Sequence, residues 1–167
     1  INNVTFGMVI NSADHVIDIN GFNYDSVDKA QLVISTEENV INIYYTKRND
    51  LSYTVNYLEK DTNRVLKDAK VVNGVRFEDV ITSSNEVVSI DGFNFDSADK
   101  ETLTIATENN VINLYYTKRT DLSYTVNYLE KETNNVLNKQ KVVNGVTFET
   151  VIKSEDEVIE IDGYNYD

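Results

Sequence analysis

The sequence predicts a mostly β domain of the α+β class that is repeated in tandem. Residues 1–50 align without gaps to residues 72–121, and residues 51–96 align to residues 122–167. A sustained match at one fixed offset, 71 residues between positions 51 and 122, indicates an array of units with one fold. Within each unit, apolar and polar residues alternate with period two, which is typical of strands that bury one face.

We take residues 51–121 as one complete repeat, residues 1–50 as the C-terminal part of a repeat and residues 122–167 as the N-terminal part of another. The linker between repeats, residues 119–121, contains neither Gly nor Pro. Because so short a linker restricts movement, we expect neighbouring repeats to pack on each other in a stiff array. Neither end of the chain looks like a natural terminus, so we expect it to be part of a longer protein.

The complete repeat opens with two predicted strands. The first covers residues 51–57 and presents three apolar residues on one face: Tyr53, Val55 and Tyr57. A polar, turn-like stretch at residues 59–63 leads into a second strand over residues 65–72. The dipeptide Asn73-Gly74 is a strong turn signal and is expected to close that strand.

A short helix and three more strands are predicted to follow. Residues 75–81 place Phe77, Val80 and Ile81 at i, i+3 and i+4, which favours a short helix ending near Ser83-Ser84. Strands are then predicted at residues 86–90, 103–106 and 111–117. Between the first two, after a turn at Asp91-Gly92, apolar and polar residues alternate over residues 93–96. In the last strand three apolar residues share a face: Ile112, Leu114 and Tyr116.

About 70 residues in the order strand, strand, helix, strand, strand, strand favour a β-grasp (ubiquitin-like) domain. In that fold the first and last strands lie side by side at the centre of the sheet, and here they are the most apolar and aromatic strands. The alternative is a small immunoglobulin-like β-sandwich, which normally needs about 100 residues and seven strands.

The composition argues against several classes of function. The formal net charge of −13 disfavours binding to nucleic acid phosphates or to anionic lipid. No apolar run is long enough to insert into a membrane. The chain has no Cys, its single His15 is replaced by Glu in the other copies, and no Gly-rich phosphate loop is present. We therefore expect no enzyme activity and no obligatory cofactor.

Four oxygen-bearing side chains in the middle of the repeat form a Ca²⁺ candidate: Asp91, Asn94, Asp96 and Asp99. Carboxylate and amide oxygens at alternate positions are the ligands that Ca²⁺ prefers. The glycine-centred loop and closing Glu of an EF-hand are absent, and the alternative is a solvated acidic loop.

The Tyr-rich strands suggest a second candidate site. Tyr115 and its counterpart Tyr44 lie on the strand face opposite the apolar set, where they are candidates for stacking against sugars. The alternative is that both are ordinary sheet residues, which period-two placement also explains.

Lys118 with Asn113 or Asn56 supplies the residue types of a Lys–Asn isopeptide bond. The alternative is that Lys118 covers apolar surface at a strand end.

Charge is segregated along the complete repeat. Residues 60–76 carry five basic side chains against two acidic ones, whereas residues 77–110 carry eight acidic side chains against one basic one. Such segregation can steer contacts between neighbouring repeats, and the alternative is ordinary variation of surface residues.

Three segments of the repeat carry a resemblance to a known family: Tyr53-Thr-Val-Asn-Tyr57 with the turn at 59–63, Asp91-Gly92-Phe93, and Val111 to Lys118. The repeat resembles the mucin-binding protein (MucBP) repeats of Gram-positive surface proteins and the B-repeats of internalin-type proteins. The resemblance implies a β-grasp-like fold, a secreted protein at the bacterial cell surface or cell wall, and a role in adhesion.

From these observations we expect stalk or spacer repeats of a cell-surface adhesin or filament. The partners would be neighbouring repeats and other copies in a fibre. The alternative is a multivalent module that binds host mucin or glycans.

Overall fold

The computed structural model describes residues 3–167, and the chain divides into two compact units. The first unit contains the residues up to Asn56 together with Asp68–Glu86 and Ala98–Leu114. The second contains Tyr57–Lys67, Val87–Ser97 and Tyr115–Asp167. The compact units are therefore not the repeats, because each takes part of residues 51–121.

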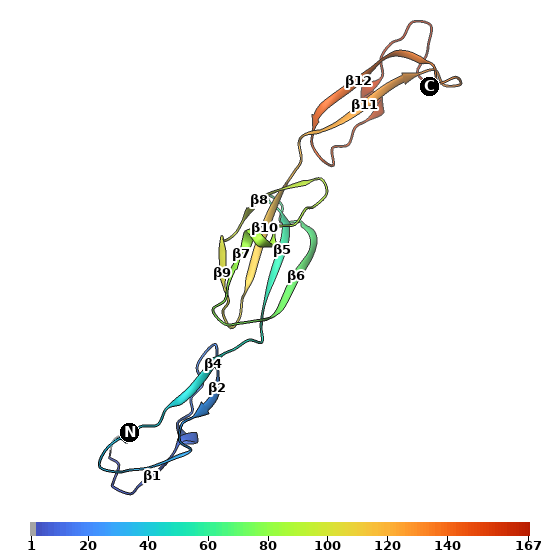
Figure 1. Ribbon diagram of the computed structural model, residues 1–167. Coiled ribbons are helices and arrows are strands. Elements are labelled where there is room, and N and C mark those ends of the chain that lie inside the picture. The colour runs from blue at the N-terminus through green and yellow to red at the C-terminus, as the bar shows by residue number, and fades with distance from the viewer. Residues whose placement is uncertain (1–2) are drawn as a thin grey trace. The chain divides into compact units, whose positions relative to one another are not determined.

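The complete repeat contains a four-stranded sheet with the order β6-β5-β10-β8 (Figure 1). Its strands are β5 (Leu51–Glu59), β6 (Val65–Val75), β8 (Phe93–Ala98) and β10 (Val111–Lys118). The first and last strands of the repeat, β5 and β10, lie side by side at the centre, as predicted. Their apolar composition fits this place, since a central strand has a neighbour on each edge.

The core of the repeat lies on one face of this central pair. On β5 the side chains of Tyr53, Val55 and Tyr57 are buried, with Val55 0% exposed, and the polar residues between them are exposed or half-buried. On β10 the buried residues are Ile112, Leu114 and Tyr116. The faces predicted from period-two alternation are confirmed for both strands.

The short helix predicted over residues 75–81 is wrong. Glu78 has a φ of 66°, which a right-handed helix does not permit, and Val80–Thr82 forms strand β7. Strand β7 pairs with β9 (Thr102–Thr104), so that Ile81 lies opposite Leu103 and Val80 is 61% exposed. Seven residues are too few to separate a helical period from a turn followed by a strand.

Two further local predictions are also wrong. No strand forms over residues 86–90, where the 3-10 helix η2 (Ser83–Glu86) is followed by a single bridge between Ile90 and Phe93. The dipeptide Asn73-Gly74 does not end its strand, because β6 continues to Val75 while Gly74 takes a φ of 74°. A β-bulge that uses a left-handed glycine explains both the turn-like sequence and the continuing strand.

The same elements recur in the two flanking segments. Strands β1 (Val9–Asn11) and β3 (Gln31–Val33) pair as β7 and β9 do, and β2 (Phe22–Val27) pairs with β4 (Ile43–Lys47) as β8 does with β10. Strands β11 (Leu122–Leu129) and β12 (Val136–Val146) repeat β5 and β6. The 3-10 helices η1 (Ser12–His15) and η3 (Ser154–Glu157) repeat η2.

The fold is mostly β, as predicted. Within residues 3–167 the only helical elements are three 3-10 helices of four residues each. In this part of the chain no helix has the length and apolar character needed to cross a membrane.

Candidate functional site: the joint between successive repeats

Backbone hydrogen bonds connect successive repeats, and the first of these joints lies within the first compact unit. The Arg48 N–H donates to the Gly21 carbonyl at 2.9 Å, and the Phe77 N–H donates to the Arg48 carbonyl at 2.8 Å. The next amide, Glu78 N–H, donates to the Ile105 carbonyl inside its own repeat at 2.8 Å. The adjacent amides at positions 77 and 78 therefore donate to carbonyls of two different repeats. These two bonds connect the repeats at one point of the backbone.

The second compact unit contains the same joint, 71 residues further on. The Arg119 N–H donates to the Gly92 carbonyl at 2.9 Å, and the Phe148 N–H donates to the Arg119 carbonyl at 2.8 Å. The three positions and the directions of both bonds are those of the first joint. The arrangement is therefore specified by the repeat sequence.

An aromatic pair covers each joint. The rings of Phe22 and Phe77 are 5.6 Å apart at an interplanar angle of 68°, and those of Phe93 and Phe148 are 5.5 Å apart at 69°. Edge-to-face pairs at such distances contribute more stability than the burial of their apolar surface alone would give. The residue at the same repeat position in the first segment, Phe6, has no such ring against it in residues 3–167 and is 79% exposed.

A glycine makes room for each phenylalanine. Gly21 has a φ of +82° and Gly92 a φ of +78°, a region that side chains with a Cβ rarely adopt. A Cβ on Gly21 would lie 2.4 Å from the Phe77 ring, and one on Gly92 would lie 2.5 Å from the Phe148 ring. Both the backbone conformation and the ring contact therefore require glycine at this position.

Ion pairs surround the second aromatic contact. The Glu149 carboxylate lies 2.8 Å from Lys118 and 3.0 Å from Arg64, both in the preceding repeat. Hydrogen bonds from Lys118 first, and then from Arg64, hold the pKa of Glu149 below its usual range. In the first joint the equivalent Glu78 lies 2.6 Å from Lys47. A carboxylate at this position thus contacts basic side chains of the preceding repeat at both joints.

Arg64 combines three contacts at the second joint. Its guanidinium lies 5.6 Å from the centre of the Phe93 ring, pairs with Glu149, and also pairs with Glu59 of its own repeat at 3.1 Å. A planar guanidinium can stack on a ring and bind carboxylates with its edge at the same time. Asn135 stands at this position in the following copy, so this part of the joint differs between repeats.

The linkers are held by an ion pair between neighbours in sequence. Arg48 pairs with Asp50, and Arg119 with Asp121, each through two hydrogen bonds of 2.9 Å. These bonds lower the pKa of both aspartates. Because both aspartates are exposed and both arginines are partly exposed, the pairs fix the local conformation of the linker more than they add stability.

A buried carboxylate forms a second recurring contact, inside the repeat. Glu86 is 8% exposed and accepts hydrogen bonds from the Tyr53 hydroxyl at 2.9 Å and from Lys70 at 2.5 Å. In the last segment Glu157 accepts from the Tyr124 hydroxyl at 2.6 Å and from Lys141 at 2.6 Å. We call this set, at either place, the Tyr–Glu–Lys contact.

Sequence reasoning missed both recurring contacts. The signal for the joint was the triplet of Gly, Phe and Arg at fixed positions, and the signal for the Tyr–Glu–Lys contact was that Tyr, Lys and Glu recur together. Neither could be recognised without knowing which residues come close in space.

The four residues of the Ca²⁺ candidate are engaged separately. Asp96 pairs with Lys60 at 2.7 Å, and Asp99 accepts hydrogen bonds from the backbone and side-chain nitrogens of Asn113. Asp91 raises the pKa of Arg119 by its charge, as a lesser cause than Asp121, and Asn94 is exposed. Among residues 3–167 no three or more His, Asp or Glu side chains are grouped so as to hold a metal ion. The Ca²⁺ site therefore stays a prediction from the sequence.

The remaining sequence candidates lie on the sheets. Tyr44 is 50% exposed, and Tyr115 is half-buried on the face opposite the buried Tyr116. Lys118 contacts Glu149, whereas Asn56 and Asn113 bond to each other through their side chains at 2.9 Å. The tyrosines remain candidates for sugar stacking.

The chain matches no model of a known protein family and no curated protein sequence.

Proposed function

We propose that these are structural spacer repeats, forming the stalk of a secreted bacterial cell-surface adhesin or filament. The observation that supports this function is the joint, which is built twice from the same residues. A spacer has to keep its units at fixed positions, and each joint limits rotation by backbone bonds, an aromatic pair and a glycine without room for a side chain. The proposal includes a β-grasp-like repeat with β5 and β10 at its centre and without an α-helix.

Small-angle scattering of the 167-residue chain tests this function. If the joints hold, one arrangement of the repeats fits the scattering curve. Chains with increasing numbers of repeats, divided between Asp50 and Leu51, should then grow in length linearly. Replacing Phe148 with Ala removes the ring that lies on Gly92 and Phe93. We expect the scattering of Phe148→Ala to require a broad set of arrangements.

Phe6→Ala is the matched control, because Phe6 occupies the same repeat position but is exposed. It should scatter as the unsubstituted chain does. The spacer function is rejected if the unsubstituted chain itself requires a broad set of arrangements, or if Phe148→Ala scatters as Phe6→Ala does.

A multivalent module for host mucin or glycans is the second candidate. It is favoured by Tyr44, which is 50% exposed, because an exposed aromatic ring can stack against a sugar. Binding that rises steeply with the number of repeats, and that is lost in Tyr44→Ala, would support this function over the spacer. Unchanged binding in Tyr44→Ala would remove this tyrosine from the candidate site.

A further inference from the structure

The glycine of the first joint lies in a tight turn. The Phe22 N–H donates to the Ile19 carbonyl at 3.0 Å, so Asn20 and Gly21 form the middle of the turn. Gly21 supplies the positive φ that a turn of this kind takes at its third residue. Within residues 3–167, neither the Asn20 carbonyl nor the Gly21 N–H forms a hydrogen bond. The peptide unit between these two residues is therefore not held by any other part of the described chain.

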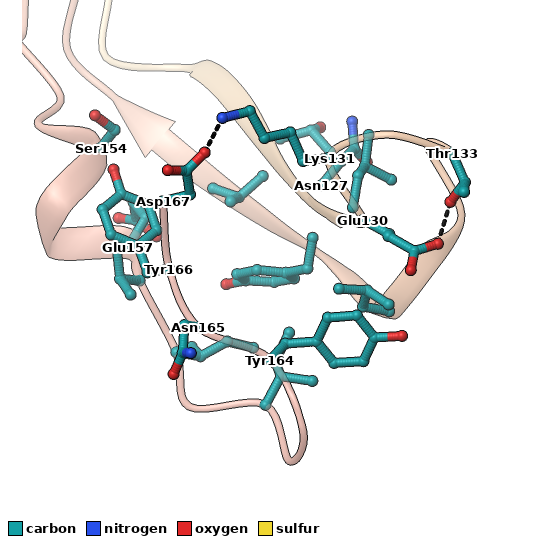
Figure 2. Close-up of a pocket in the computed structure, with 18 of the residues that line it drawn as sticks. Asn127, Glu130, Lys131, Thr133, Ser154, Glu157, Tyr164, Asn165, Tyr166 and Asp167 are labelled. Atoms are coloured by element: carbon teal, nitrogen blue, oxygen red, sulfur yellow. Dashed lines mark hydrogen bonds and ion pairs between the residues drawn. The ribbon is translucent and has the colours of Figure 1, made fainter.

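The turn recurs in the two other copies with a different residue before the glycine. It is formed by residues 90–93 and by residues 161–164, which end at Tyr164 (Figure 2), and in both it is closed by a hydrogen bond of 3.1 Å. Asp91 and Asp162 stand where the first copy has asparagine. The turn is thus a feature of the repeat, whereas the Asn-Gly pair belongs to the first joint.

An asparagine before a glycine can lose its side-chain amide, because glycine has no side chain that hinders the approach of its nitrogen. The Gly21 nitrogen attacks Cγ of Asn20, and the bond from Cγ to the amide nitrogen breaks. The amide leaves as ammonia with the proton of the Gly21 N–H, and a cyclic imide remains. Water opens this imide at Cγ to give aspartate, or at the main-chain carbonyl to give isoaspartate, in which the main chain runs through the former side chain.

We propose that Asn20 is a modification site, which deamidates through this cyclic imide while the chain is folded. The Asn20 side chain is exposed, so water reaches it. Closing the imide requires rotation of the peptide unit between Asn20 and Gly21, and no hydrogen bond opposes this rotation. The other Asn-Gly pairs, Asn73-Gly74 and Asn144-Gly145, lie within strands β6 and β12. There the same rotation requires local opening of the strand, so these pairs react more slowly.

The modification changes the first joint. The Gly21 carbonyl accepts the Arg48 N–H, and Gly21 lies against the Phe77 ring. Isoaspartate lengthens the main chain by a methylene group immediately before Gly21 and so displaces both contacts. Aspartate leaves the main chain unchanged, and the second joint has the same hydrogen bonds with Asp91 at this position. That isoaspartate loosens the array rests on the proposed spacer function, whereas the modification itself does not.

Peptide mapping by mass spectrometry tests the modification on three asparagines of one chain. The folded 167-residue chain is incubated at mildly alkaline pH, and the gain in mass when OH replaces NH₂ is followed over time. Asn20 should react at least about tenfold faster than Asn73 and Asn144, because only the latter two need local opening. In guanidinium chloride the three should react at similar rates. Equal rates in the folded chain, or a lead of Asn20 that persists in the unfolded chain, would overturn the proposal.

Hydrogen exchange of the Arg48 amide tests the effect on the joint. Chains that contain isoaspartate at position 20 are separated by chromatography, and their Arg48 amide should exchange at least about tenfold faster than in the fresh chain. Asn20→Asp should exchange as the fresh chain does, because its main chain has the original length. Equal exchange in the isoaspartate chain and in Asn20→Asp would overturn this effect.

Asn20→Gln is the matched control for ageing. Its longer side chain forms a cyclic imide far more slowly, so the incubated variant should keep the slow exchange of its Arg48 amide. An Arg48 amide that exchanges freely in the fresh chain would reject the joint, and with it the effect of isoaspartate on the joint. The mass measurement does not depend on the joint, so failure of the modification and failure of the spacer function give different results.

Discussion

Strands β5 and β11 have the same sequence and different surroundings. Residues 51–60 and 122–131 are identical, yet Tyr57 is 2% exposed while its counterpart Tyr128 is only half-buried. Both strands form and both pair with the strand that follows them, β6 or β12. The difference is that β5 has β10 on its other edge. Local sequence is therefore enough to form the hairpin, whereas burial requires a strand from the far end of the repeat.

The partner strands show the same difference. Leu114 on β10 is fully buried, and its counterpart Ile43 on β4 is half-buried. Their sequences differ at one position in eight. The comparison indicates that β5 and β10 bury each other's apolar side chains and so depend on each other for stability, although about 50 residues of sequence separate them.

The largest difference is expected when Leu114 on β10 and its counterpart Ile43 on β4 are each replaced by alanine. Leu114→Ala removes fully buried methyl groups and should lower the free energy of unfolding of the complete repeat by about 2–5 kcal/mol. Ile43→Ala should cost clearly less, because its side chain is already half-exposed. Urea denaturation followed by NMR signals of each repeat measures both. Equal losses would mean that the difference in burial carries little free energy.

A smaller effect is expected at a pair of glycines. Gly92 and Gly163 both have positive φ, +78° and +81°, but a Cβ would meet the Phe148 ring only at Gly92. Gly163→Ala should cost about 1–2 kcal/mol for the left-handed backbone alone. Gly92→Ala should cost more and should also weaken hydrogen-exchange protection of the Phe148 amide. If the two substitutions have the same effect on stability, the ring contact at the joint is not stabilising.

The smallest effect concerns pH and the Tyr–Glu–Lys contact of the last segment. Hydrogen bonds from Lys141 first, and then from Tyr124, lower the pKa of Glu157. A carboxylate with a lowered folded-state pKa contributes stability above the usual glutamate pKa, and this contribution is lost as the pH falls through the lowered value. Carbon-13 NMR titration should find the pKa of Glu157 below that of a glutamate in an unfolded peptide.

Lys141→Met is the control for this titration. It removes the first cause of the shift and should move the pKa of Glu157 back towards its usual range. An unchanged pKa in the variant would mean that the lysine does not contact this carboxylate in solution.

Much of the fold could be predicted because apolar and polar residues alternate with period two along the central strands. Alternation over residues 51–57 and 111–117 identified the buried faces of β5 and β10. Their central position was predicted from the order of the elements and from the apolar composition of both strands. The helix predicted over residues 75–81 does not form, because the apolar residues of this segment do not share one buried face. Phe77 contacts an aromatic ring of the neighbouring repeat, and Val80 is exposed. Such a pattern cannot distinguish a contact inside a repeat from one between repeats.

The candidate site was much less predictable than the fold. The segregation of charge suggested contacts between repeats, and Arg64 of the basic stretch does contact Glu149. The joint itself depends on Gly92, Arg119 and Phe148, which are 27 and 29 residues apart in sequence. No local pattern indicates that these three meet.

The sequence by itself determined the repeat, its period, and the buried faces of the two central strands β5 and β10, because these depend on the spacing of residues near each other in the chain. Only the tertiary structure decided which copies of a strand are covered and which phenylalanine lies on which glycine. It also decided which carboxylate meets lysine and tyrosine. These contacts join residues that are distant in sequence, and identical residues make them or lack them according to the neighbours that the fold supplies.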